Sequence, residues 1–270
     1  MTDSIPATSQ VAVDLPGSWN ARDSATLTGT RAGVLWRSAT LSELTDAGRA
    51  RLAELGVRTV VDLRSPVEVE RDGVDTAGGD VTVHALPVTA GAQVPGAVVA
   101  AEHHGGAPSG DGYLAALRAM LTQGDPGQGA AQFMEDTYRA IVTDPASTEA
   151  LGTALQLVAT SPGPVLVHCA AGKDRTGLLV STAQRLVGVP TDRVEADFLY
   201  SNRAADQHRI GISADGLDPA YLQPLRRVSL RYLHAAWEEV DAVHGGFDGY
   251  RRALGVDDAL LAALRARLAG

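Results

Sequence analysis

The only cysteine of the chain, Cys169, lies in the stretch HCAAGKDRTG at 168–177, which also carries a histidine, a lysine, an aspartate and an arginine. Arg175 follows Cys169 by six positions, at the far rim of the same short loop. A cysteine thiolate is a strong nucleophile, and the planar guanidinium of arginine can hold two oxygens of a phosphate. These residue types at this spacing indicate nucleophilic attack on a phosphate group.

The neighbouring elements are expected to position this loop. Residues 164–167 predict a strand, and residues 176–187 predict a helix. A loop between a strand end and a helix start directs backbone N–H groups and the positive end of the helix toward its centre, which makes an anion site. A thiol held there ionises more readily than a free cysteine. The expected phosphate-binding residues are Ala170, Ala171, Gly172, Lys173 and Thr176.

Each polar residue of the loop has an expected role. Cys169 attacks phosphorus to give a phosphocysteine that water then hydrolyses, while the amides and Arg175 stabilise the five-coordinate transition state. Thr176 can donate a hydrogen bond to the sulfur, and His168 fixes the loop from beneath. Lys173 supplies a second cation for substrates with more than one phosphate. The alternatives are a buried apolar role for Cys169 and a solvated one for Lys173.

Acidic and basic residues outside the loop have structural alternatives. Arg64 and Glu68, four residues apart after a strand, are expected to pair with each other. Asp62, at the carboxyl end of that strand, could orient Arg175. His103 and His104 lack a third ligand at suitable spacing, so we interpret them as exposed loop histidines. The proposed chemistry requires no metal and no other cofactor.

The elements along the chain predict one α/β domain over residues 1–270. Extended segments are expected at 33–38, 57–63 and 81–86, and the last two are expected to be buried strands. A crossover helix, capped by Thr45 or Ser42, is expected before the strand at 57–63. Residues 90–129 are rich in Gly and Pro and predict a lid or a flexible insertion with a helical piece at 113–121. Further helices are expected at 130–142, 147–160, 191–206, 219–243 and 257–268.

Composition excludes several classes of protein. The formal net charge of −9 disfavours a nucleic-acid partner. No run of eighteen apolar residues could span a bilayer, so no integral membrane association is expected. The N-terminal residues lack the basic and apolar regions of a secretory signal, which favours a cytoplasmic protein, with signal-independent export left open.

The motifs resemble those of a known family. The Cys-x5-Arg stretch is similar to the signature of protein tyrosine phosphatases, in the form carried by atypical bacterial tyrosine and phosphoinositide phosphatases. The N-x-R-D, Y/W-R-S, D-L-R-S-x-x-E and D-Y-L-x-S-N motifs of that family have counterparts over residues 20–205, which are Asn20 to Asp23, Trp36 to Ser38, Asp62 to Glu68, and Asp197 to Asn202. The resemblance implies a phosphatase-like fold, with a mostly parallel sheet flanked by helices, extra C-terminal helices, and supporting roles for Arg22 and Asp23. One departure is Ser24-Ala25-Thr26, where the family usually has Leu-Gly-Gly.

Expulsion of the leaving group needs a proton donor, and three aspartates are candidates. The resemblance implies Asp174, within the loop itself, and we favour it. Asp136 lies in a helical stretch where a solvated position is expected, and Asp144 precedes Pro145 and is expected to cap a helix.

Three functions remain at this stage. The favoured one is a phosphomonoesterase for phosphotyrosine, with phosphoserine, phosphothreonine or phosphoinositides as further substrates. The second is a phosphatase for a phosphorylated metabolite. The third is a catalytically dead module that binds phosphate, against which the presence of Cys169, Arg175 and Thr176 argues.

Overall fold

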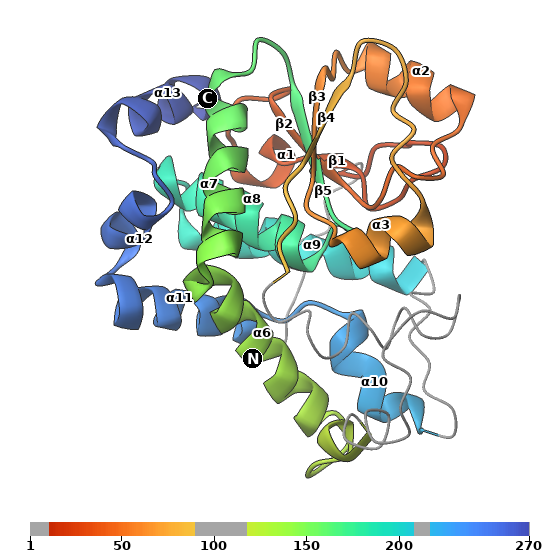
Figure 1. Ribbon diagram of the computed structural model, residues 1–270, viewed down its shortest axis with the longest axis vertical. Helices are drawn as coiled ribbons and strands as arrows, with labels where there is room; N and C mark the ends of the chain where they lie inside the picture. Colours follow the sequence, from red (N-terminus) through yellow and green to blue (C-terminus); the bar gives the residue numbers. More distant parts are fainter. Residues whose placement is uncertain (1–10, 90–117, 208–216, 270) are drawn as a thin grey trace.

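A five-stranded sheet forms the centre of the computed structural model, which describes residues 11–89, 118–207 and 217–269 (Figure 1). The strands lie in the order β1-β2-β5-β3-β4, and only the β1–β2 pair is antiparallel. Their bounds are β1 Arg22–Asp23, β2 Leu35–Ser38, β3 Thr59–Asp62, β4 Thr82–Ala85 and β5 Val165–His168. The expected α/β fold with a mostly parallel sheet is confirmed.

Successive residues of the central strands pack into two different cores. Val165 and Val167 of β5 belong to the larger cluster, whereas Leu166 between them belongs to the smaller one. Since side chains alternate across a strand, helices must cover both faces of the sheet. Leu52 of α2 (Asp46–Glu54) packs in the smaller cluster. The larger cluster receives side chains from α6 (Gln128–Thr143), α7 (Pro145–Thr160), α8 (Asp174–Leu186), α9 (Thr191–Gln207), α10 (Pro219–Arg226), α11 (Leu230–His244), α12 (Phe247–Ala253) and α13 (Asp258–Leu268).

Local sequence signals begin several of these helices. Thr45, one of the two expected caps, accepts a hydrogen bond from the N–H of Gly48 at the start of α2. Asp144 caps α7 as expected and accepts from the N–H of Ser147 at 2.8 Å. Ser65 and Glu68 form a capping box at the start of α3 (Pro66–Asp72), a helix that the sequence analysis missed. The capping box turns the Glu68 carboxylate back toward the end of β3.

Strand register brings polar side chains to one edge of the sheet. His168, the last residue of β5, lies opposite Ser38 of β2 and Asp62 of β3. All three strands run parallel, so their carboxyl ends meet there, and the loop after β5 begins at this edge. This edge is where ligands bind in open α/β sheets.

The single helix expected at 219–243 is wrong, because the chain forms α10 and α11 with an extended residue between them. Arg227 has a φ of −119° and a ψ of 153°, and Ser229 caps α11. The side chain of Asn202 in α9 accepts from the N–H of Val228 at 2.8 Å and donates to its carbonyl at 2.9 Å. Both backbone groups of Val228 are therefore used outside a helix.

Other expectations also need correction. β4 pairs only with β3 and is mostly exposed, so it is an edge strand rather than a buried one. α8 begins at Asp174, two residues earlier than expected, because Lys173 O accepts the N–H of Gly177. Short elements were missed at β1, α1 (Ala25–Thr28), α3 and α12. Of the proposed insertion, residues 90–117 lie outside the described residues; 118–121 are helical, and α6 starts at Gln128, within the segment.

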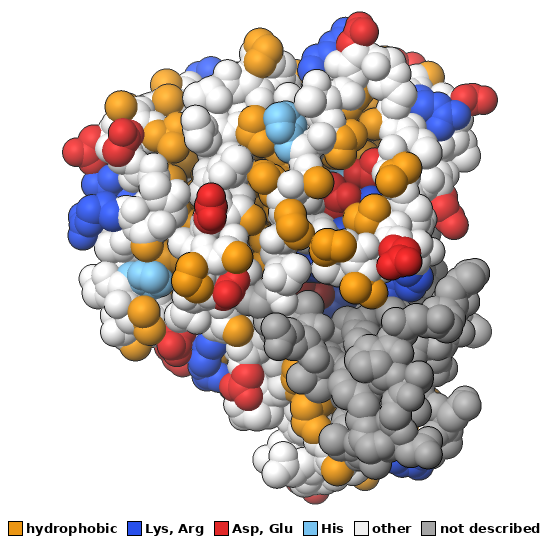
Figure 2. Space-filling view, in the orientation of Figure 1, with side chains coloured by type: hydrophobic (Ala, Val, Ile, Leu, Met, Phe, Trp, Pro, Cys, Tyr) orange, Lys and Arg blue, Asp and Glu red, His pale blue; other side chains and the backbone are white. Residues whose placement is uncertain are grey.

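Two features of the described residues bear on the expected partners. Among the described residues, no helix combines the length and the apolar character needed to span a bilayer. On the face drawn in Figure 2, Lys and Arg side chains are scattered among Asp and Glu and do not gather in one patch. That a nucleic-acid partner is lacking stays a prediction.

A buried ion cluster fastens β1 and β2 to α9. Arg22 Nε lies 2.9 Å from Asp197 Oδ1, and Arg37 Nη1 lies 3.0 Å from Asp197 Oδ2. Burial would raise the pKa of Asp197, but the two guanidinium groups hold it below its usual range. Burial and the neighbouring Arg37 lower the pKa of Arg22 to about 10. One carboxylate thus serves two buried arginines.

Removing this carboxylate should be costly. Asp197→Ala leaves two buried guanidinium groups without their counter-ion, and we expect a loss of about 3 to 5 kcal/mol in the free energy of unfolding, measured in urea. Asp206→Ala is the control, because Asp206 pairs with Arg227 on the exposed side of the same helix and should cost less than about 1 kcal/mol. Equal losses in the two variants would contradict the structural importance of the cluster.

Candidate active site

Every backbone carbonyl from 168 to 173 has a hydrogen-bond donor, and all but that of Cys169 find it outside this stretch. Because a buried carbonyl without a partner is costly, these contacts fix the orientation of each peptide plane. Leu63 N–H donates to the carbonyl of His168, His168 Nδ1 to that of Cys169, and Thr40 N–H to that of Ala170. Asn20 Nδ2 donates to the carbonyls of Ala171 and Gly172, the second of which also accepts from Arg37 Nη2. Gly177 N–H donates to the carbonyl of Lys173, and all these donor–acceptor distances range from 2.9 to 3.3 Å.

The N–H groups of the loop consequently face its centre. In a trans peptide the carbonyl of one residue and the N–H of the next point in opposite directions, and no described peptide bond is cis. The N–H groups of residues 170–176 donate to no described residue. The loop runs into the N-terminus of α8, where Lys173 at the N-cap position places no side chain on the first turn. The arrangement is a cradle of donors suited to an oxyanion.

Gly172 is required by the geometry of this cradle. Its φ is +64°, a region that favours glycine, and a Cβ there would lie 2.0 Å from the carbonyl oxygen of Ser38. The loop therefore packs directly on the backbone that follows β2.

Cys169 lies at the base of the loop. It is 2 % exposed and packs in the larger hydrophobic cluster. The expected hydrogen bond from Thr176 to the sulfur is not present: Thr176 Oγ1 is buried and has no partner among the described residues. That the sulfur lies beside the guanidinium of Arg175 stays a prediction from the sequence.

Arg175 is held by Glu68. Its Nη1 and Nη2 lie 2.6 and 2.5 Å from the two carboxylate oxygens, and Nη1 also donates to Leu63 O at 3.2 Å. Burial opposes the charge of each group, but their pairing outweighs it. The pKa of Glu68 falls to about 2, and that of Arg175 rises above its usual value.

The expected partners of Arg64 and Asp62 were wrong. Arg64 contacts not Glu68 but Asp62 and Asp75, each at 2.8 Å from Nη2. Asp62, which was expected to orient Arg175, is paired with Arg64 instead, through both carboxylate oxygens. The backbone N–H of Arg64 also donates to Asp62 Oδ1, at 2.9 Å, so Asp62 binds both the backbone and the side chain of Arg64.

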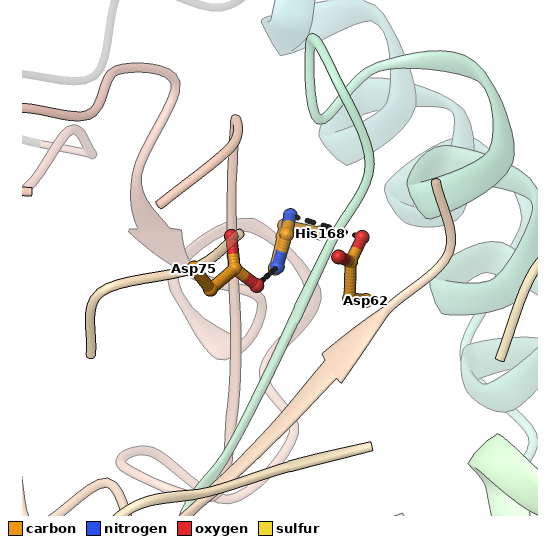
Figure 3. Close-up of side chains that lie close together, drawn as sticks. All are labelled: Asp62, Asp75 and His168. Atoms are coloured by element: carbon orange, nitrogen blue, oxygen red, sulfur yellow. Dashed lines mark hydrogen bonds and ion pairs between the residues drawn. The ribbon is translucent and has the colours of Figure 1, made fainter. Parts of the chain in front are cut away.

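His168 lies between two carboxylates beneath the loop (Figure 3). Nε2 is 2.7 Å from Asp75 Oδ2, and Nδ1 is 3.8 Å from Asp62 Oδ1 as well as 3.3 Å from Cys169 O. Although burial opposes it, His168 and Arg64 hold the pKa of Asp75 below its usual range. His168 therefore contacts the loop from its buried side, where it was expected.

Asp62, Asp75 and His168 are also close enough together to hold a metal ion. Their ligand atoms are already engaged, however, because Arg64 binds both carboxylates and His168 binds Asp75. The positive charge that faces both carboxylates is the guanidinium of Arg64. These residues fit an ion-paired support for the loop better than a metal centre.

Asp174 and Lys173 are ion-paired with each other. Lys173 Nζ lies 2.9 Å from Asp174 Oδ2 and donates to Leu225 O at 2.7 Å. Lys173 is 4 % exposed, so the solvated alternative is wrong. Tyr138 Oη donates to Asp174 Oδ1 at 3.0 Å.

The two other candidate acids have the structural positions expected for them. Asp136 is exposed on α6 and accepts from Gln132 and Arg139, and Asp144 caps α7. Neither is linked to the loop by a contact among the described residues. Of the three aspartates, only Asp174 belongs to the cradle.

The segment before β1 supports the loop. Asn20 donates to the carbonyls of both Ala171 and Gly172, and Arg22 donates to Asn20 Oδ1 at 2.6 Å. Asp23 accepts from the N–H groups of Ala25 and Gly33, so it holds the turn in which the sequence departs from the family pattern. Arg22 thus acts through Asn20, and Asp23 acts on the turn rather than on the loop.

Several site residues were missed or misjudged in the sequence. The capping-box spacing of Ser65 and Glu68 was the available signal for a carboxylate turned toward the end of β3. Tyr138 was noted only as part of a helical stretch. Asp75 lies in a segment without strand or helix periodicity and gave no signal.

The fold and the loop together define the class of cysteine-dependent phosphatases, in which a Cys-x5-Arg loop follows a parallel strand and opens a helix. Residues 13–270 match the tyrosine phosphatase family. Triple specificity protein phosphatase PtpB of Mycobacterium tuberculosis is 35 % identical over 95 % of this chain and 99 % of that protein. A putative tyrosine-protein phosphatase of Cupriavidus necator is 32 % identical over 90 % of this chain and 84 % of its own length, and a tyrosine-protein phosphatase of Nostoc commune is 25 % identical over 94 % and 80 %. The chain belongs to the tyrosine phosphatase family and is a hydrolase of phosphoric monoesters.

Glu68→Gln tests the support of Arg175. Loss of the carboxylate charge frees the guanidinium from its fixed position, and we expect kcat/KM to fall by about 10-fold or more. Glu70→Gln, on the exposed side of the same helix, is the matched control and should leave kcat/KM unchanged.

The same variant has a signature in stability. The pKa of Glu68 is lowered from 4.5 to about 2 in the folded protein, so its contribution to stability is complete above about pH 4.5 and is lost as pH falls toward 2. The difference in unfolding free energy between wild type and Glu68→Gln should shrink over this range. A difference that stays constant from pH 7 to pH 2 would contradict the ion pair.

Proposed function

We propose that this chain hydrolyses phosphotyrosine through a phosphocysteine intermediate and also accepts phosphoserine, phosphothreonine or phosphoinositides. The proposal is supported by the loop between β5 and α8: each carbonyl from 168 to 173 has a hydrogen-bond donor, which leaves the N–H groups of residues 170–176 to bind the oxygens of a phosphate that Cys169 attacks. Such a cradle stabilises charge that develops on phosphoryl oxygens.

The reaction has two steps. The Cys169 thiolate attacks phosphorus, the bond from phosphorus to the leaving oxygen breaks, and Asp174 gives its proton to that oxygen. Arg175 and the N–H groups hold the three equatorial oxygens in the transition state. A water then attacks the phosphocysteine, Asp174 takes a proton from it, and the breaking S–P bond returns the electron pair to sulfur. Inorganic phosphate leaves, and no metal takes part.

The proposed breadth of substrates is supported by a relative and sets a condition on Lys173. The Mycobacterium tuberculosis relative is named a triple specificity protein phosphatase, and its alignment covers nearly all of both chains. Binding of a second substrate phosphate by Lys173 would require Nζ to turn from Leu225 O and Asp174. A cytoplasmic location, expected from the sequence, stays a prediction.

Cys169→Ser tests the nucleophile. Wild type should hydrolyse p-nitrophenyl phosphate in the presence of EDTA, and the variant should lose at least about 1,000-fold in kcat, because a serine hydroxyl is hardly ionised at neutral pH. Rapid quenching of the wild type should trap phosphate on Cys169. Undiminished turnover by the variant, or loss of wild-type activity in EDTA, would contradict the mechanism.

The substrate class is tested on the same protein. Phosphotyrosine peptides should give the highest kcat/KM in a panel that also holds phosphoserine peptides, phosphoinositides, sugar phosphates and nucleoside phosphates. A preference for the small metabolites would favour the alternative, a biosynthetic phosphatase. Binding without turnover of any of them would indicate a dead phosphate-binding module.

Asp174→Asn tests the proton donor. A good leaving group needs little protonation, so kcat/KM should fall by about 100-fold for phenyl phosphate but by only a few-fold for p-nitrophenyl phosphate. Asp136→Asn and Asp144→Asn are the controls and should show no such dependence on the leaving group. If either control shows it instead, Asp174 is not the acid.

A further inference from the structure

Both oxygens of the Asp174 carboxylate have a hydrogen-bond donor. Tyr138 Oη lies 3.0 Å from Oδ1, and Lys173 Nζ lies 2.9 Å from Oδ2. The two donors come from different parts of the chain, Tyr138 from α6 and Lys173 from the loop itself. Each oxygen therefore accepts from its own donor, so the orientation of the carboxyl group is fixed from two sides.

The position of the Tyr138 hydroxyl is set by helix packing. The ring is completely buried and lies edge-on to Phe198 of α9, with ring centroids 6.2 Å apart. It also packs against Tyr232 of α11 at 5.9 Å. A phenylalanine would fill the same space, so packing alone does not account for the hydroxyl.

The hydroxyl of Tyr138 keeps its own proton. Burial, and then the charge of Asp174, raise the pKa of Tyr138 well above its usual value. Tyr138 is therefore a hydrogen-bond donor at neutral pH and not an alternative acid. A buried hydroxyl needs a partner, and among the described residues the one it has is Asp174.

We propose that Tyr138 is a positioning residue that holds Asp174 for proton transfer to the leaving group and from water. This inference rests on the proposed function, since it needs Asp174 to be the acid. When Asp174 gives its proton to the leaving oxygen, the new carboxylate receives hydrogen bonds from Tyr138 and Lys173, so the products of that step are stabilised.

The geometry also indicates which oxygen carries the proton. Lys173 has a second acceptor, Leu225 O at 2.7 Å, and can release Oδ2 without losing all its partners. Tyr138 has no other acceptor among the described residues and stays on Oδ1. Oδ2 is therefore the oxygen that carries the proton before the first step.

Tyr138→Phe removes the hydroxyl and keeps the ring. The measurement is kcat/KM, taken separately for phenyl phosphate and for p-nitrophenyl phosphate. The value of kcat/KM reports the steps up to phosphocysteine formation. We expect about a 10-fold loss for phenyl phosphate, as for a lost hydrogen bond to a charged group, and less than about a 2-fold loss for p-nitrophenyl phosphate. Tyr250→Phe is the control: Tyr250 is also completely buried, its hydroxyl has no partner among the described residues, and both substrates should be unaffected.

A double-mutant cycle shows whether Tyr138 acts through Asp174. In an Asp174→Asn background, Tyr138→Phe should cause no further loss for phenyl phosphate, because the group it positions is already disabled. An equal loss for both substrates, or a loss that persists in the Asp174→Asn background, would overturn the inference and indicate a purely structural role.

The outcome is separable from that of the proposed function. If Asp174→Asn shows no dependence on the leaving group, the acid assignment and this inference both fall, whereas the Cys169→Ser measurement still decides whether a phosphocysteine forms. If Cys169→Ser remains active, the proposed mechanism fails whatever Tyr138 does.

Discussion

The orientation of six consecutive carbonyls, at 168–173, is the constraint on which the candidate site depends. Each has a donor, and the donors come from the residue after β3, from β2 and the segment after it, from the segment before β1, from α8, and, for the carbonyl of Cys169, from the side chain of His168. A phosphate cradle needs the opposite faces of these peptides to be free. Donors bind every carbonyl on the side away from the centre of the loop, so the surrounding fold fixes the orientation of each peptide plane.

The charges around the loop follow the same logic. Two of the supporting arginines are buried with Asp197, and Arg64 has two carboxylates, Asp62 and Asp75. The charges of these three arginines are balanced by the carboxylates beside them, so the arginines support the structure and do not bind the ligand. Among the described residues, Arg175 has one ion-pair partner, Glu68, whose two carboxylate oxygens contact Nη1 and Nη2 and fix the plane of the guanidinium. The positive charge offered to a phosphate therefore comes from Arg175 and the loop amides, and it does so in a protein of net charge −9.

The sequence predicted the parts of the site that are contiguous in the chain. The strand, the loop and the helix after it could be inferred because Cys169, Gly172 and Arg175 lie within seven residues of one another. The pair of Arg175 and Glu68 could not, because it joins residues 107 positions apart and is set by strand register. Likewise, the break between α10 and α11 depends on Asn202, a side chain of another helix, and no local pattern near Val228 reports it.

The position of Asp174 suggests what the helices packed beside the loop do. A proton donor on a separate loop has to be brought to the substrate by movement of that loop, whereas Asp174 is the first residue of α8 and travels with the cradle. Its direction is then set by what packs beside it: Tyr138 on α6, held by α9 and α11, and Lys173, tied to the backbone of α10. The extra helices thus position the proposed acid, while the sheet and the segment before it position the proposed nucleophile. Within one ten-residue motif, the residue near the start is therefore positioned by the sheet, and Asp174 is positioned by the helices.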